Sequence, residues 1–180
     1  MQKLQQAHDE SAHRDILSFD LYKRLKHMVL HFYKYAGKIE SARITGDLSQ
    51  LRKILIDAFI ICMASANAIN LSLGKTIFNE AEMPNLDALA RELGKGLSSR
   101  DLFAETLHAL LIFGGQMAKA IESADHMECG DPRTTMEVLI PKLAAVILGV
   151  LSQLDGHLEK DIRDRLHAVE QKSIFSAINR

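Results

Sequence analysis

Apolar residues recur at helical spacing along most of the chain. Between Ile16 and Arg43 they fall three or four positions apart, which places them on one face of a helix: Leu21, Leu25, Met28, Val29, Phe32, Ala36 and Ile39. Gly46 and Asp47 then interrupt the pattern. We therefore predict one long helix over 16–43 and a second over 48–73, the second being apolar almost all round and hence central.

The second half of the chain shows the same alternation after a less regular segment, 74–98, in which we predict only a short helix over 86–93. Ser98 or Ser99 is suited to cap the next long helix, with Asp101 in its first turn. Three further helices are predicted, at about 99–128, 134–156 and 158–177, of which the last is amphipathic. The fold class expected is all-α: four long helices forming a bundle, plus a C-terminal helix.

The two halves resemble each other in sequence. Ile39-Glu40-Ser41-Ala42 recurs as Ile121-Glu122-Ser123-Ala124, at an offset of 82. Gly-Asp then recurs at 46–47 and 130–131, and Leu-Ile at 55–56 and 139–140, both at an offset of 84. This ordered series predicts one domain, 1–180, that contains two repeated helical hairpins, 16–73 and 99–156, joined by 74–98. Aligning Gly37 with Gly115 gives an offset of 78 instead, so the register of the repeat stays open.

The overall charge and composition exclude several classes of protein. The chain has 22 basic and 23 acidic residues, which gives no basic footprint for nucleic acid and no polybasic signal for a membrane. Residues 1–15 are polar and unlike a signal peptide, and no uncharged apolar run reaches 18 residues. The two cysteines, Cys62 and Cys129, form no disulfide framework, so we expect a cytoplasmic protein.

Three segments, 35–42, 107–121 and 55–71, carry a resemblance to a known family in their helical framework. The first two are similar to the first, glutamate-rich helix of the MazG-like all-α nucleoside triphosphate pyrophosphohydrolase superfamily, and 55–71 is similar to its second helix. The resemblance covers most of the chain outside 1–15 and 74–98. It implies a helical bundle whose carboxylates hold Mg²⁺ against the phosphates of a nucleotide, and single-hairpin relatives that dimerise to build that bundle.

The carboxylates of the family pattern are largely replaced in this chain. Where the first helix should carry glutamates, one copy has Lys34, Tyr35 and Lys38, and the other has Ile112, Phe113 and Gln116. Asp57 matches the aspartate of the second helix, while Ile54 replaces its glutamate. Since Mg²⁺ requires oxygen ligands, these replacements predict that family-type hydrolysis is lost.

The candidate metal ligands are Asp57, Glu40 and Glu122. Asp57 lies in an apolar run, so it needs a metal, a bound proton, or a basic partner such as Arg52, Lys53 or another basic residue. Glu40 and Glu122 occupy matching places in the two halves and are otherwise expected to be solvated. No catalytic or cofactor-binding residue is assigned.

Two histidine spacings also carry possible metal chemistry. His27 and His31 lie four positions apart, hence on one helical face, but the sequence offers no evident third ligand. Glu105 and His108 have the Glu-x-x-His spacing of metal-binding bundles, without a second copy. The histidine pair is interpreted as part of a polar or half-buried helix face, and the Glu-x-x-His spacing as incidental. Asp47 and Asp131 are interpreted as turn or cap residues.

Three functions follow from the sequence. The first is a degenerate MazG-like protein that is non-catalytic and acts through binding or assembly, with a nucleotide or a second copy of the chain as candidate partner. The second is a Mg²⁺-dependent nucleoside triphosphate pyrophosphohydrolase with carboxylates drawn from Asp57, Glu40, Glu105, Glu122 or Glu137. The third is an unrelated α-helical regulatory or interaction domain.

Overall fold

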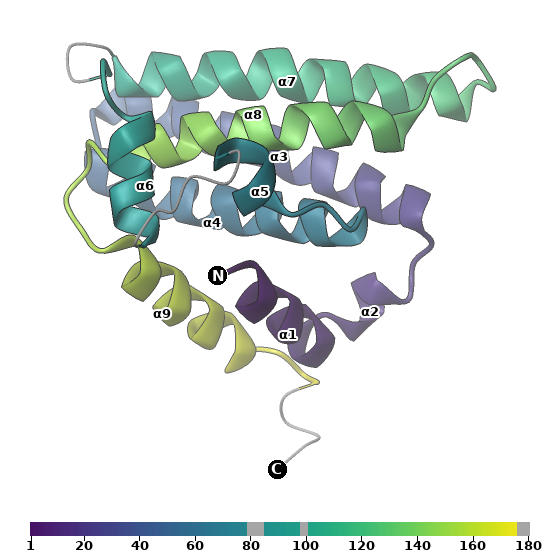
Figure 1. Cartoon of the computed structure of the whole chain (residues 1–180), viewed down its shortest axis with the longest axis horizontal. Helices are drawn as coiled ribbons and strands as arrows, with labels where there is room; N and C mark the ends of the chain where they lie inside the picture. Colours follow the sequence, from purple (N-terminus) through teal and green to yellow (C-terminus); the bar gives the residue numbers. More distant parts are fainter. Residues whose placement is uncertain (79–84, 98–100, 176–180) are drawn as a thin grey trace.

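A computed structural model describes residues 1–78, 85–97 and 101–175, and within these ranges the chain forms helices and no strand (Figure 1). The predicted all-α class is confirmed. The helices are α1 (Gln2–Ala12), α2 (Arg14–Leu17), α3 (Leu21–Thr45), α4 (Leu48–Ala68), α5 (Leu73–Phe78), α6 (Leu86–Leu93), α7 (Leu102–Asp125), α8 (Pro132–Leu151) and α9 (Leu158–Glu170).

The four long helices, α3, α4, α7 and α8, pack side by side. Helix α3 contacts α4 and α7, and α8 contacts the same two helices from the opposite corner. The most buried elements are α4 and α8, whose apolar side chains meet in one core cluster with those of α3 and α7. Burying each Leu or Ile of this cluster contributes roughly 1.5–3 kcal/mol, so the core supplies most of the driving force for folding.

The aspartates of the two Gly-Asp positions cap the helices that follow them, α4 and α8, in the same way. The side chain of Asp47 accepts a hydrogen bond from the backbone N–H of Gln50 at 2.8 Å, and Asp131 accepts one from Thr134 at 3.1 Å. Each aspartate therefore satisfies an otherwise unpaired donor in the first turn of the following helix. Gly46 ends α3 with φ of +66°, a conformation that glycine adopts without strain. The interpretation of both aspartates as caps is confirmed.

Several predicted boundaries were wrong, and each has a local cause. The helix predicted over 16–43 begins only at Leu21, because Asp20 caps it through the backbone N–H of Lys23. The helix predicted over 48–73 ends at Ala68, and Asn70 has φ of +59° before α5 begins. At the start of α7 the cap is Asp101, which accepts hydrogen bonds from the backbone N–H groups of residues 103 and 104. Ser98 and Ser99, the predicted caps, lie outside the described residues.

Helix α8 is the one helix in the described part of the chain that is long and apolar enough to cross a membrane. Of its most apolar window, 61% is buried inside the structure. Its contacts with α4 and α7 account for that apolarity, as expected for the central helix of a packed core.

A second layer lies below the four long helices in the view of Figure 1, where α1 and α9 converge beneath α4. Helix α1, which the sequence did not predict, docks on α4 mainly through polar side chains. The amide of Asn67 donates to Gln5 Oε1 at 2.7 Å, and the amide of Gln2 donates to Asn67 Oδ1 at 2.8 Å. Helix α9 is amphipathic, as predicted, and buries Leu158, Ile162 and Leu166.

Candidate functional site

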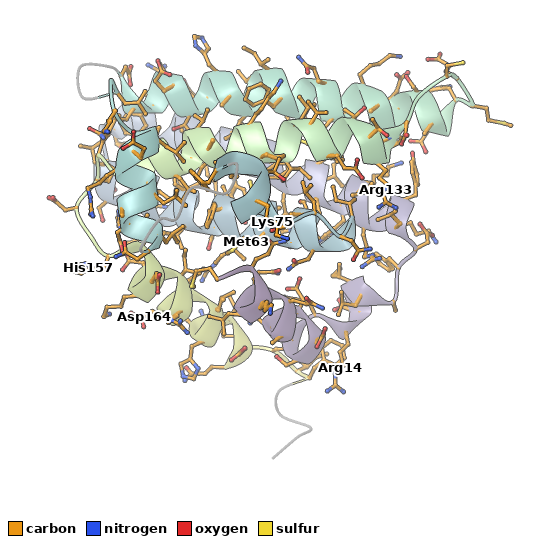
Figure 2. The ribbon with its side chains drawn as sticks, in the orientation of Figure 1. Arg14, Met63, Lys75, Arg133, His157 and Asp164 are labelled. Atoms are coloured by element: carbon orange, nitrogen blue, oxygen red, sulfur yellow. The ribbon has the colours of Figure 1, made fainter. Side chains whose placement is uncertain are left out.

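Two cavities open between the bundle and this second layer. The larger one, about 930 Å³, is lined mainly by apolar and amide side chains of α1, α4, α5 and α6. Met63 and Lys75, labelled in Figure 2, lie on its wall. Phe78 and Asn85, on either side of the undescribed residues 79–84, also line it.

The smaller cavity, about 460 Å³, lies between α1, α2, α3, α4 and α9, and we call it the histidine cavity. Four of the chain's eight histidines line it, together with cations, carboxylates and one buried tyrosine. Its charged and histidine residues are His8, Asp9, Glu10, His13, Arg24, His27, His31, Lys34, Lys38, Asp57 and Arg165. This concentration of titratable groups in one concave site makes it the candidate functional site.

Asp57 lies on the wall of the histidine cavity and is paired with Arg165 of α9. The two guanidinium nitrogens Nε and Nη2 donate to the two carboxylate oxygens at 2.5 and 3.1 Å. The predicted alternative of a basic partner is thus correct in kind, but the partner is neither Arg52 nor Lys53. Because both oxygens of Asp57 are engaged in this bidentate pair, a metal ion would have to displace Arg165.

The other predicted metal ligands lie elsewhere and have partners of their own. Glu40 forms a bidentate pair with Arg43 at 2.7 Å on the surface of α3, and Glu122 pairs with Lys119 at 2.5 Å on α7. Of the additional carboxylates, Glu137 pairs with Arg133 at 3.0 Å. In the described ranges, no three of these predicted carboxylates come within metal-binding distance of one another. Their role as metal ligands stays a prediction without a shared site.

Several cations line the wall of the histidine cavity together with Asp57. Lys34 and Lys38 line the cavity one helical turn apart on α3, and Arg165 lies opposite on α9. Burial lowers the pKa of Lys34, and the neighbouring charges of Lys38 and Arg165 lower it further, against the opposing effect of Asp57. Arg24 adds a buried Nε that has no hydrogen-bond partner among the described residues. The cavity therefore presents positively charged hydrogen-bond donors to a molecule that enters it.

His31 and His27 form a hydrogen-bonded series with Lys34. The ammonium of Lys34 lies 2.8 Å from His31 Nδ1, and His31 Nε2 lies 3.1 Å from His27 Nε2. Because an ammonium can only donate, His31 Nδ1 is the acceptor and its proton resides on Nε2, which donates to His27. Burial, reinforced by the charge of Lys34, lowers the pKa of His31 to about 4.

This depressed pKa predicts a loss of stability in mild acid. The unfolded chain protonates an ordinary histidine near pH 6.5, whereas folded His31 stays neutral until about pH 4. Between these values the unfolded state binds more protons, so the free energy of unfolding falls as the pH is lowered through this window. We expect His31 to contribute about 1–2 kcal/mol of this loss, allowing for solvent screening at a half-buried site.

Urea unfolding at pH 7.0 and 4.5 measures the effect. The His31→Gln variant should lose less stability between the two pH values than the unaltered chain, while His108→Gln, on the exposed face of α7, should lose as much. Equal pH dependence in all three proteins would show that His31 titrates normally.

Helix α1 contributes the groups on the far wall of the cavity. His8 is buried, and its Nδ1 lies 3.0 Å from a carboxylate oxygen of Glu170 in α9. Asp9 accepts a hydrogen bond from the Gln5 amide at 2.6 Å. Burial raises the pKa of Asp9, and that hydrogen bond and the nearby His13 and His8 oppose the shift. The sequence prediction missed all of these residues; the spacing of Gln5, His8 and Ala12 is the helical signal that marks this face.

No protein-family model, curated protein or solved structure matches this chain. The resemblance to the MazG-like superfamily therefore stays a prediction made from the sequence.

Proposed function

We propose that this chain is a degenerate MazG-like helical protein that is non-catalytic and binds an anionic small molecule, with nucleotides as the first candidates, in the histidine cavity. The observation that carries this proposal is the surrounding of Asp57. The carboxylate of Asp57 is paired with Arg165, and Lys34 and Lys38 line the same part of the histidine cavity. Phosphate groups are recognised by such clusters of cationic donors.

The same arrangement speaks against hydrolysis through Mg²⁺. A magnesium ion that acts on a phosphate chain needs carboxylate ligands in near-octahedral geometry. Two lysines and an arginine beside a single paired aspartate offer one such ligand, and they repel the metal. They can instead neutralise the charge of a phosphate directly, so binding to this cavity should not require Mg²⁺.

Titration with nucleoside mono-, di- and triphosphates by calorimetry, with and without Mg²⁺, tests the proposal. We expect binding that does not need the metal, and no release of pyrophosphate. The Lys34→Ala and Arg24→Met variants should each weaken binding about 10- to 100-fold, since each removes a charge-assisted hydrogen bond. Lys142→Ala, on the exposed face of α8, is the matched control and should bind as the unaltered chain does.

Two outcomes would contradict the proposal in different ways. Mg²⁺-dependent release of pyrophosphate, abolished by Asp57→Asn in a folded protein, would establish the pyrophosphohydrolase. Absence of both binding and turnover across the panel would remove the nucleotide from consideration and leave an assembly or interaction role.

An assembly role has a specific observation of its own. Leu30 and Tyr33 of α3, and Leu111 and Ile112 of α7, are large apolar residues that are between 41% and 62% exposed on two helices in contact. A second copy of the chain is the occupant we propose for this face, because two identical apolar patches can cover each other across a two-fold axis. Light scattering during size-exclusion chromatography would reveal a dimer. The free thiols of Cys62 and Cys129 support a cytoplasmic location for either role.

A further inference from the structure

We infer that His8, Asp9 and His13 form a binding site for a divalent transition-metal ion of the zinc class at the α1 wall of the histidine cavity. Each of these residues offers one ligand atom, and the three atoms lie within 4.8 Å of one another. Among the described residues, this is the one group of three or more His, Cys, Asp or Glu side chains whose ligand atoms lie this close together. The site is distinct from the predicted carboxylates, and it does not depend on the binding of an anion.

The end of helix α1 is what brings the two histidines together. In a continuous helix, residues 8 and 13 would point about 140° apart around the axis. Helix α1 instead ends at Ala12, and His13 has φ of −131° and ψ of 42°. This turn places the two rings edge to face, with 5.3 Å between their centroids. Tetrahedral ligands of zinc lie about 3.3 Å apart. Side-chain rotations that shorten the distances between the ligand atoms, now up to 4.8 Å, by roughly 1.5 Å would therefore suffice.

His8 and Asp9 each have one possible ligand atom engaged by a neighbouring side chain and keep a second one. Glu170 occupies Nδ1 of His8, which leaves Nε2 for a metal, and a carboxylate on the second nitrogen is the usual partner of a metal-bound histidine. Gln5 donates to Oδ2 of Asp9, which leaves Oδ1. His8 is 4% exposed, so this ligand is already shielded from solvent before any metal binds.

The choice of ligands selects the class of metal. Two imidazole nitrogens and one carboxylate suit zinc, cobalt or nickel, whereas Mg²⁺ prefers oxygen ligands alone. Three protein ligands leave a coordination position open. Because all three residues line the histidine cavity, that position is accessible to a molecule bound there.

The other histidine pair on the cavity wall is less suited to a metal. His27 Nε2 and His31 Nε2 are 3.1 Å apart, but Lys34 donates to His31 Nδ1 and so places the ring proton on Nε2. A metal at that nitrogen would require the proton to move to Nδ1, where it would oppose the ammonium. The pair is therefore committed to its hydrogen bond, and it serves as a comparison in the test.

Titration of the chelator-treated full chain with Zn²⁺, and separately with Co²⁺ followed by visible absorbance, tests this inference. We expect one equivalent of metal, with a cobalt spectrum of four- or five-coordinate geometry. His13→Ala and Asp9→Asn should each weaken Zn²⁺ binding by about 100-fold or more, and Glu170→Gln by about 10-fold. His13 and Asp9 are only half-buried, so these variants are expected to fold, which far-UV circular dichroism checks.

The control variants decide between this site and others. His108→Ala, on the exposed face of α7, and His27→Ala should both bind Zn²⁺ like the unaltered chain. Unchanged affinity in His13→Ala and Asp9→Asn would overturn the inference. Loss of binding in His27→Ala alone would overturn it too, because the metal would then belong to the His27–His31 pair.

Discussion

Replacing Arg52 with methionine is expected to lower the free energy of unfolding by about 3 kcal/mol. The side chain of Arg52 is 13% exposed, and its guanidinium joins α4 to α9 and to the end of α8. It donates to Asp161 of α9 through Nε at 3.0 Å, and to the backbone carbonyls of Leu151 and Leu154 at 3.3 and 3.0 Å. Methionine fills a similar volume but leaves these acceptors without a donor. Urea unfolding followed by circular dichroism measures the loss.

The neighbouring residue provides the control for this substitution. Lys53 is exposed on the same turn of α4, so Lys53→Met should change stability by less than about 0.5 kcal/mol. Equal losses in the two variants would mean that the carbonyls at the end of α8 find other donors when Arg52 is removed.

Substitution of Gly94 by alanine is expected to cost about 2 kcal/mol of stability, because helices α6 and α8 approach too closely there for a side chain. A Cβ atom at this position would overlap Ser152 Oγ and lie 2.8 Å from the carbonyl oxygen of Gly149. The approach is close from both sides, since a Cβ on Gly149 would lie 3.0 Å from the carbonyl oxygen of Leu93. Thermal and urea unfolding both report the change.

The same chemical change at Gly37 should have the opposite sign. Gly37 lies on the exposed face of α3, and a Cβ there would meet nothing within 4 Å. Alanine at a solvent-exposed helical position is favoured over glycine by about 0.5–1 kcal/mol. A stabilised Gly94→Ala variant would show that α6 can move away from α8 without loss.

Hydrophobic spacing predicted the four long helices and the short helix over 86–93, because these elements bury a continuous apolar face. It missed α1 because that helix docks through Gln5 and His8, which no hydrophobic pattern registers. It also ran the second helix past Ala68, since apolar residues continue to Leu73 beyond the turn. Periodicity thus located the core and failed where polar contacts or a turn decide the conformation.

The candidate site was predictable only in part, for a different reason. Local reasoning required some partner for Asp57, a basic residue being one of the alternatives, since an unpaired carboxylate in an apolar run is costly. The partner, Arg165, lies 108 residues further along the chain, and only the packing of α9 on α4 brings the two together. The group of His8, Asp9 and His13 depends likewise on the end of α1, which spacing within a continuous helix does not describe.

The histidine cavity is closed by the earliest and the latest helices of the structure, and this has a consequence for synthesis. The four long helices all lie between residues 21 and 151, so a growing chain can begin to form the bundle before α9 exists. Arg165 and Glu170 reach Asp57 and His8 only after translation has passed them. A nascent chain stalled short of residue 158 would therefore contain the four long helices of the bundle but lack the α9 wall of the histidine cavity. A ligand of that cavity could not assist the early steps of folding.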